Sequence, residues 1–219
     1  IIMTSRIALI HATRAAISPV ELAFSEIWPE AAYWNLLDEG LNQLLERVGE
    51  LNEELQQRFV RLATYAADTG IDGLLFTCSA FGPAMEECKK RFLFPTLKPN
   101  EAMFEVGIEN GSRIGLLASH PVTLPMLETQ LDSLSKERGR DITIQTQLAV
   151  GAWEALRTGD QTSHDEIVIN SAHKLNHCDV ILLAQFSMAP LAEAIQSVLK
   201  AKIVSSPHAA VRKIRRMLS

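Results

Sequence analysis

The chain has few cysteines, few aromatic residues and no long apolar run. Three cysteines among 219 residues are too few for the disulfide framework of a small secreted protein. No apolar stretch reaches membrane-spanning length, and the first three residues are too few for a signal peptide. These absences predict a cytoplasmic protein that has no membrane partner.

An excess of positive charge is also lacking. The formal net charge is −5, so there is no electrostatic basis for binding nucleic acid. The one basic cluster, at residues 212–216, falls in a predicted terminal helix, where cations suit the helix dipole. His173 and His177 have a spacing that can chelate zinc, but no carboxylate motif accompanies them. We therefore expect no nucleic-acid partner and no metal.

Predicted strands alternate with predicted helices along the whole chain. Hydrophobic residues make up 47% of the sequence, which is enough for a substantial core. The strands are expected at 5–11, 32–37, 71–77, 94–97, 113–118, 141–148, 180–184 and 202–205. The helices are expected at 19–27, 52–68, 83–91, 101–109, 121–137, 153–176 with a break at 158–160, 189–200 and 209–218, Ser18 capping the first. This alternation predicts an α/β fold with parallel sheets.

The second half of the chain repeats the strand and helix order of the first half. Residues 6–11 correspond to 113–118, and residues 73–78 correspond to 180–185. The repeat predicts an internal duplication into two similar lobes, related by a pseudo-twofold axis, with a cleft between them. We expect the first lobe to span 3–98 plus 205–219 and the second to span 99–204.

Cys78 follows a buried strand and precedes a short loop and a helix. In open parallel sheets, ligands bind at the carboxyl ends of the strands, so this thiol is expected at a ligand site. Backbone N–H groups at the next helix start would lower its pKa, which suits a base or a nucleophile. His11 ends the first strand and is a candidate acid, because imidazole titrates near neutral pH. Capping of a loop is the alternative for His11.

The segment 77–80 resembles the first cysteine motif of the aspartate/glutamate racemase superfamily. The segment 183–189 falls where the second cysteine motif belongs and is most similar to the hydantoin racemase branch. Residues 113–123 are similar to the central strand and substrate-binding loop of that family. The resemblance implies cofactor-independent chemistry at a carbon next to a carboxylate or carbonyl, on a small-molecule carboxylate or amide, by two cysteines on opposite faces. A homo-oligomer is also common in the family.

The second cysteine position holds Gln185, whose amide is neither an acid nor a base near neutral pH. Three hypotheses stay open. The first is an isomerase or racemase-like enzyme with Cys78 as base or nucleophile. The second is a lyase or decarboxylase with one-sided protonation, and the third is a non-catalytic binder of small carboxylates. The catalytic candidates are Cys78 and His11, and the expected substrate contacts are Ser79, Ala80, Ser119, His120, Thr123, Gln185, Phe186 and Ser187.

Overall fold

The computed structural model describes residues 4–219, and the chain divides into two compact units. Unit 1 comprises residues up to 101 together with 210–219, and unit 2 comprises residues 102–209. Residues 1–3, which include the first residue of the expected first lobe and the segment too short for a signal peptide, lie outside the described range. No helix within residues 4–219 is long and apolar enough to cross a membrane.

Unit 1 is built on a parallel four-stranded sheet in the order β2-β1-β3-β4. The strands are β1 (Arg6–His11), β2 (Ala32–Leu37), β3 (Gly73–Phe76) and β4 (Thr96–Leu97). The helices are η1 (Arg14–Ala16), α1 (Ile17–Ile27), α2 (Glu39–Val48), α3 (Glu53–Asp68), η2 (Ser79–Phe81), α4 (Gly82–Arg91) and the later part of α10 (Ser206–Leu218).

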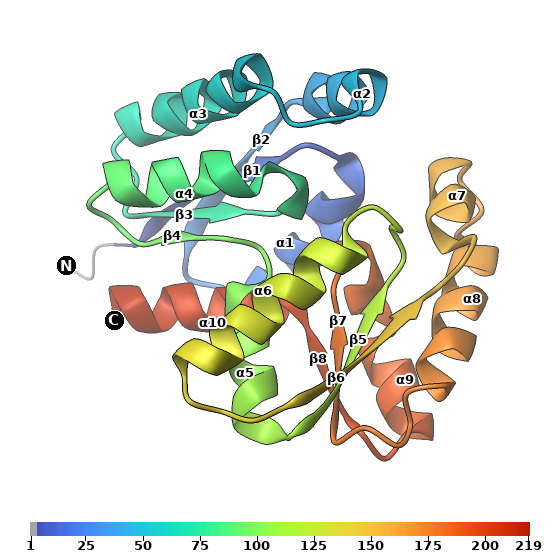
Figure 1. Cartoon of the computed structure of the whole chain (residues 1–219). Coiled ribbons are helices and arrows are strands. Elements are labelled where there is room, and N and C mark those ends of the chain that lie inside the picture. The colour runs from blue at the N-terminus through green and yellow to red at the C-terminus, as the bar shows by residue number, and fades with distance from the viewer. Residues whose placement is uncertain (1–3) are drawn as a thin grey trace. The chain divides into compact units, whose positions relative to one another are not determined.

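Alternate strand residues of unit 1 face different helices. Leu74 and Phe76 belong to a buried cluster with α3 and α4, which lie along one side of this sheet in Figure 1. Gly73 faces the other way, where a Cβ atom would meet Ile214 and Leu218 of α10. The period of two along β3 therefore buries the strand on both faces, as its continuous apolar sequence requires.

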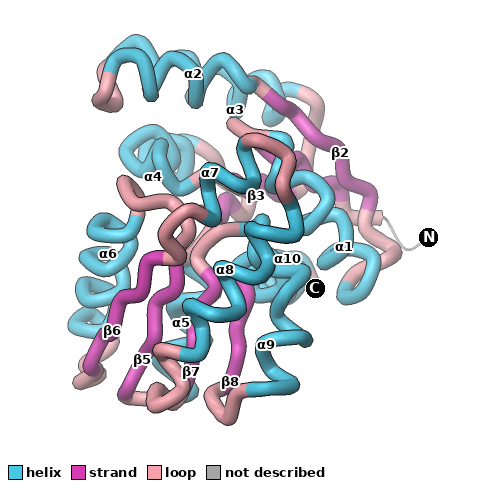
Figure 2. The backbone as a smooth tube through the Cα atoms, turned by 90° about the vertical axis from the view of Figure 1, so that its right-hand side faces the viewer, coloured by secondary structure: helices cyan, strands magenta, loops and turns pink. Residues whose placement is uncertain are grey.

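Unit 2 is built on a second parallel sheet in the order β6-β5-β7-β8, and Figure 2 shows these strands side by side. The strands are β5 (Arg113–Ala118), β6 (Thr143–Leu148), β7 (Val180–Leu183) and β8 (Lys202–Ser205). The helices are α5 (Glu101–Asn110), α6 (Leu124–Glu137), α7 (Ala152–Arg157), α8 (Gln161–His173), η3 (Phe186–Leu191) and α9 (Ala192–Val198). Leu116 and Leu182 pack toward α5 and α6, whereas Leu117 and Leu183 pack toward α8 and α9. The predicted α/β class with parallel sheets is confirmed.

The two units repeat one strand order and one polar contact. Arg6, the first residue of β1, pairs with Asp72 just before β3, and Arg113, the first residue of β5, pairs with Asp179 just before β7. In both pairs the aspartate also accepts a hydrogen bond from the arginine backbone N–H, and the partners are 66 residues apart in sequence. The duplication seen in the sequence is thus repeated in strand pairing and in electrostatics.

The structure departs from the sequence prediction in two local features. Helix α2 has no counterpart among the predicted helices, although Asp38 caps it by accepting a hydrogen bond from the backbone N–H of Gly40. Ser18 was expected to cap α1, but it lies inside that helix, and Thr13 instead caps the preceding turn η1. The second difference concerns short-range capping, where several polar residues near a helix start can serve.

The aromatic cluster of Phe59, Phe76 and Phe81 supports the turn that follows β3. The Phe59 ring centroid lies 5.0 Å from that of Phe76 and 4.8 Å from that of Phe81. We expect Phe59→Ala to lower the free energy of unfolding by about 3–5 kcal/mol, because it leaves a cavity in the core. Urea unfolding measures this effect.

Tyr65 provides the matched control for this prediction. It lies on the same helix and is 62% exposed, so Tyr65→Ala should change stability by no more than about 0.5 kcal/mol. Equal losses in the two variants would show that the Phe59 cluster does not support this region.

Candidate active site

Cys78 lies two residues beyond the carboxyl end of β3, at the start of η2. Its backbone is extended, and the chain turns immediately afterwards through Ser79 and Ala80 into η2 and α4. The thiol is half-buried. The Cys78 Sγ atom lies 3.9 Å from Asn42 Oδ1 of α2 and accepts a hydrogen bond from the backbone N–H of Ala80. The expected placement at a strand end is therefore present.

The expected activation of this thiol is wrong. Burial raises the pKa of Cys78 to about 11, and the hydrogen bond from the Ala80 N–H opposes this shift only in part. A single backbone donor stabilises a thiolate less than removal of water destabilises it. Cys78 is therefore a protonated thiol at neutral pH. In this state it can donate a proton, and it acts as a base only after losing one.

His11 is buried at the carboxyl end of β1 and uses both of its ring nitrogens. Its Nδ1 atom lies 2.8 Å from the hydroxyl of Thr77, and its Nε2 atom lies 2.9 Å from Asn35 Oδ1. Asn35 in turn donates through Nδ2 to Glu21 at 2.7 Å. We call His11, Thr77, Asn35 and Glu21 the histidine chain. Thr77, at one end of the histidine chain, is the residue that precedes Cys78.

The histidine chain determines which tautomer His11 adopts. Because the Asn35 amide nitrogen donates to Glu21, its oxygen faces His11 and the His11 Nε2 atom must carry the hydrogen. Burial lowers the pKa of His11, and the hydrogen bond that His11 donates to Asn35 and the charge of Glu21 oppose this shift. The neutral ring therefore accepts a hydrogen bond from the Thr77 hydroxyl at Nδ1. Protonation of Nδ1 would turn that hydroxyl toward the backbone oxygen of Ile10, 3.2 Å away.

A second polar cluster lies at the carboxyl ends of β5 and β7, within unit 2. Gln185 occupies the position after β7 that Cys78 occupies after β3. Its Oε1 atom accepts hydrogen bonds from the Ser119 backbone N–H at 2.7 Å and from the Ser119 hydroxyl at 3.3 Å. Its Nε2 atom donates to the Thr123 hydroxyl at 3.2 Å. We call these three residues the amide cluster.

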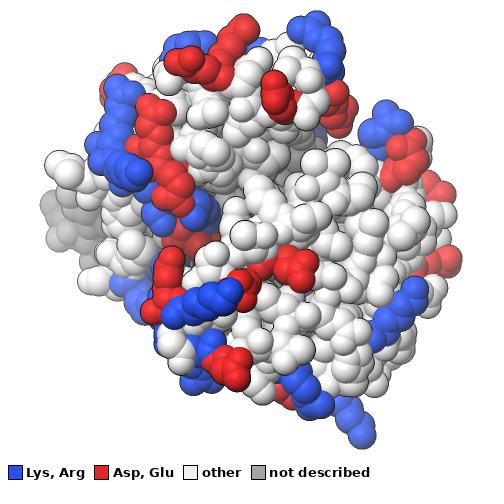
Figure 3. All heavy atoms as spheres, viewed as in Figure 1, with Lys and Arg blue, Asp and Glu red and all other residues white. Residues whose placement is uncertain are grey.

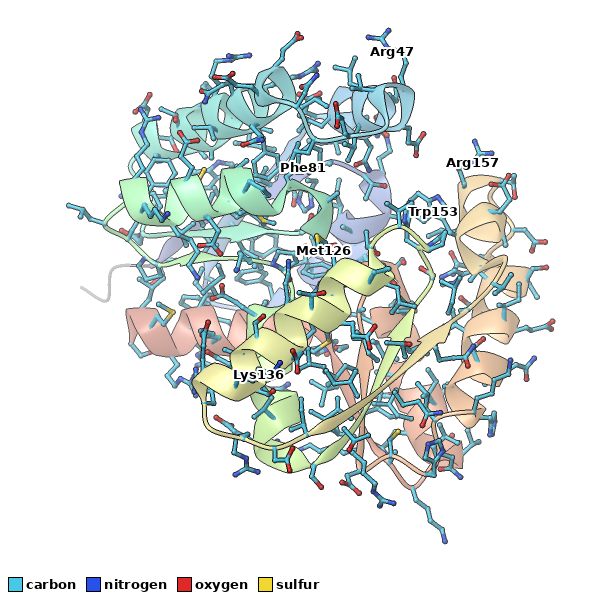
Figure 4. The ribbon with its side chains drawn as sticks, viewed as in Figure 1. Arg47, Phe81, Met126, Lys136, Trp153 and Arg157 are labelled. Carbon is cyan, nitrogen blue, oxygen red and sulfur yellow. The ribbon has the colours of Figure 1, made fainter. Side chains whose placement is uncertain are left out.

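The other predicted contacts lie in different surroundings. His120 meets the ring of Trp153, labelled in Figure 4, edge-on at a centroid distance of 4.9 Å. Phe186 is buried, so its side chain belongs to the interior, whereas Ser187 is half-buried. Cys88 and Cys178 are buried among apolar residues. Within residues 4–219, no three His, Cys, Asp or Glu side chains are grouped so as to hold a metal ion.

Sequence reasoning missed Asn35, Glu21, Asn42 and Trp153. One signal was present for Asn35, because it is a polar residue within the otherwise apolar strand β2. Glu21 carries no such signal, since an acidic residue on a helix is ordinary. Asn42 belongs to α2, which itself was not predicted.

On the face drawn in Figure 3, acidic and basic side chains are interspersed.

The sequence as a whole resembles racemases. Residues 49–214 match the model of the family described as Asp/Glu/Hydantoin racemase. No curated protein is significantly similar in sequence. Many solved structures share the fold, and three of them, all at low identity, illustrate the likeness. The allantoin racemase of Klebsiella pneumoniae is 16% identical with a TM-score of 0.73, and the match covers 98% of this chain and 88% of that one.

The other two structures are racemases of acidic amino acids. The aspartate racemase of Picrophilus torridus is 16% identical, with a TM-score of 0.72 and coverage of 98% and 94%. The glutamate racemase of Francisella tularensis subsp. tularensis SCHU S4, solved in complex with D-glutamate, is 15% identical, with a TM-score of 0.69 and coverage of 98% and 81%. At these identities the likeness shows a shared fold.

The raised pKa of Cys78 predicts slow alkylation. In a Cys88→Ser/Cys178→Ser variant, iodoacetamide at pH 8.5 should modify Cys78 about a hundredfold more slowly than free cysteine, whose pKa is about 8.5. The logarithm of the rate should rise by about one unit per pH unit between pH 7 and 9.5, because only the thiolate reacts. An alkylation rate that stops rising below pH 8.5 would contradict the raised pKa. The slope distinguishes ionisation from poor access of iodoacetamide, because poor access lowers the rate by the same factor at every pH.

The histidine chain predicts a stability effect at Asn35. Asn35→Leu leaves the His11 Nε2–H without an acceptor in the interior, so the free energy of unfolding should fall by about 1–3 kcal/mol. Urea unfolding gives the value. Glu21→Gln is the control, since a glutamine oxygen can still accept from Asn35 and the loss should be smaller. Equal losses would mean that the bond to His11 contributes nothing.

Proposed function

Because the chain belongs to the Asp/Glu/hydantoin racemase family, we propose that it is a cofactor-independent isomerase of the racemase type in which Cys78 is the reacting group. Membership makes it an enzyme of the racemase and isomerase class. The proposed reaction takes place at the carbon next to a carboxylate or carbonyl of a small molecule. The observation that supports this most strongly is the half-buried Cys78 thiol at the carboxyl end of β3.

Proton transfer at such a carbon needs a base of suitable pKa and stabilisation of the enediolate. Cys78 is proposed to remove the α-proton as a thiolate, becoming a thiol, or to return a proton as a thiol. Its pKa of about 11 makes the thiolate rare at neutral pH but strongly basic when formed. Ser79 and Ala80, whose backbone follows Cys78 directly, are proposed to contact the substrate oxygen atoms.

His11 was predicted to supply the acid, and this prediction stays untested. Both of its nitrogens are engaged within unit 1, one by Asn35 and the other by Thr77. These contacts support a positioning role, in which His11 holds Thr77 and through it the backbone that carries Cys78.

A lyase or decarboxylase with one-sided protonation is the second candidate function. One observation favours it over inversion. Of the two equivalent positions after β3 and β7, only the first holds a residue that can donate a proton. Gln185 has no acidic group, and its amide is already bonded to Ser119 and Thr123. A reaction that ends with one protonation step by the Cys78 thiol needs no second acid.

Solvent deuterium exchange tests the proposed function. Allantoin, aspartate and glutamate, the substrates named for the similar structures, are incubated with the protein in D₂O, and loss of the α-proton signal is followed by NMR. We expect exchange of at least one of them, and we expect Cys78→Ser to reduce the rate by about a hundredfold or more. Cys88→Ser is the control and should leave the rate unchanged, because Cys88 is buried in the core of unit 1.

The optical rotation of the same samples separates the alternatives. Exchange with loss of optical activity supports racemisation, and exchange with retention supports one-sided protonation. Carbon dioxide release from a malonate-type substrate supports the decarboxylase. A ligand-dependent rise in melting temperature without any exchange would mean that the protein is a binder and would contradict the proposal.

A further inference from the structure

The amide cluster of unit 2 differs from the thiol position of unit 1 in one respect. The Cys78 sulfur is bonded to one backbone N–H and lies 3.9 Å from its side-chain neighbour Asn42. The Gln185 side chain is held by three hydrogen bonds, two to Ser119 and one to Thr123. The two positions are equivalent in the strand pattern, but Cys78 is hydrogen-bonded to Ala80 of its own turn, whereas Gln185 is held by the 119–123 loop that follows β5.

The groups that hold Gln185 are those suited to an oxygen ligand. Ser119 is only 2% exposed, and its backbone N–H and hydroxyl both converge on the Gln185 Oε1 atom. Two donors on one oxygen are the arrangement that binds a carboxylate or an oxyanion. The sequence predicts that Ser119 and Thr123 contact the substrate. In the structure the carboxamide of Gln185 is hydrogen-bonded to both of them.

A side chain that is covalently attached competes strongly with a free ligand. Its effective concentration beside Ser119 is set by the short tether and reaches roughly the millimolar range or more. A carboxylate would have to displace Gln185 and leave its amide without partners. The Gln185 Nε2 atom meanwhile donates to the Thr123 hydroxyl, so the amide engages both residues of the loop at once.

We propose that Gln185 is a built-in ligand of the 119–123 loop, which occupies both Ser119 donors and so excludes a free carboxylate from them. The proposal rests on the proposed function in one respect only, namely that the ligand in question is the substrate. Gln185 is thereby a specificity-determining residue, and the occupied loop is a property of unit 2 alone.

Removal of the built-in ligand should open the loop to a free one. Gln185→Ala deletes the atoms of an acetamide molecule, and the extended backbone at this position accepts alanine without strain. We expect acetate to raise the melting temperature of this variant saturably, with a midpoint in about the millimolar range for so small a ligand. The Ser119 amide resonance should shift on the same titration. The wild-type protein should show neither effect when sodium chloride is matched.

Gln147→Ala is the matched control. Gln147 lies in β6 of the same unit and uses its Nε2 atom to donate to the Leu148 backbone oxygen, so it holds no part of the loop. This variant should not respond to acetate. The proposal would be overturned if acetate raised the melting temperature of the wild-type protein or of Gln147→Ala as much as that of Gln185→Ala. It would also be overturned if a folded Gln185→Ala variant did not respond to acetate.

A measurement on the wild-type protein covers the case in which Gln185→Ala does not fold. The Ser119 amide should exchange slowly with solvent because it donates to Gln185, and Gln185→Met should increase its exchange rate by about tenfold or more while preserving side-chain volume. Rapid Ser119 exchange in wild type would overturn the proposal. All of these readouts are repeated with Cys78→Ser, so a failure of the proposed catalysis and a failure of the built-in ligand are separate results.

Discussion

Parallel pairing of β1 with β3, and of β5 with β7, decides which side chains can meet at the strand ends of each unit. Ile10 pairs with Phe76, so the next residues, His11 and Thr77, come within hydrogen-bond distance. Leu117 pairs with Leu183, and two residues further along, Ser119 meets Gln185. A shift of one residue in either pair would turn these side chains to the opposite face of the sheet. The chemistry of both clusters depends on this register.

The duplicated backbone carries two different chemistries. After β3 the chain places a thiol, which can exchange a proton, and after β7 it places an amide, which cannot. The supporting residues differ as well. In unit 1 polar side chains form the histidine chain, which includes Thr77 next to Cys78 in sequence, and in unit 2 they hold Gln185. A shared fold with racemases therefore does not make the two halves of this protein equal partners in proton transfer.

Desolvation determines the charge state of both titratable residues in the thiol region. Burial raises the pKa of Cys78 and lowers that of His11, because in each case the charged form loses more hydration free energy than the neutral form does. The two groups are thus both neutral at physiological pH. A neutral thiol, together with a neutral imidazole whose two nitrogens are both hydrogen-bonded, differs from a thiolate and imidazolium pair, and it is consistent with a site whose resting form holds a proton ready for donation.

Local sequence patterns determined the strands, most of the helices and the duplication. An apolar run is visible among neighbouring residues in the sequence. For this reason the strand predicted at 113–118 has the same bounds as β5 in the structure. The positions of Cys78 and Gln185 at strand ends followed from the same patterns. Helix α2 was missed although Leu41, Leu44, Leu45 and Val48 recur at helical spacing in its sequence.

The partners of the functional side chains were decided only by the tertiary structure. Glu21, Asn35 and His11 come from three separate elements, and no spacing along the chain links them. The pKa of Cys78 depends on how many atoms surround the sulfur, which local sequence does not report. Hydrogen bonds and desolvation act through space between residues far apart in sequence, so the sequence could propose the residues while folding alone set their charge and their partners.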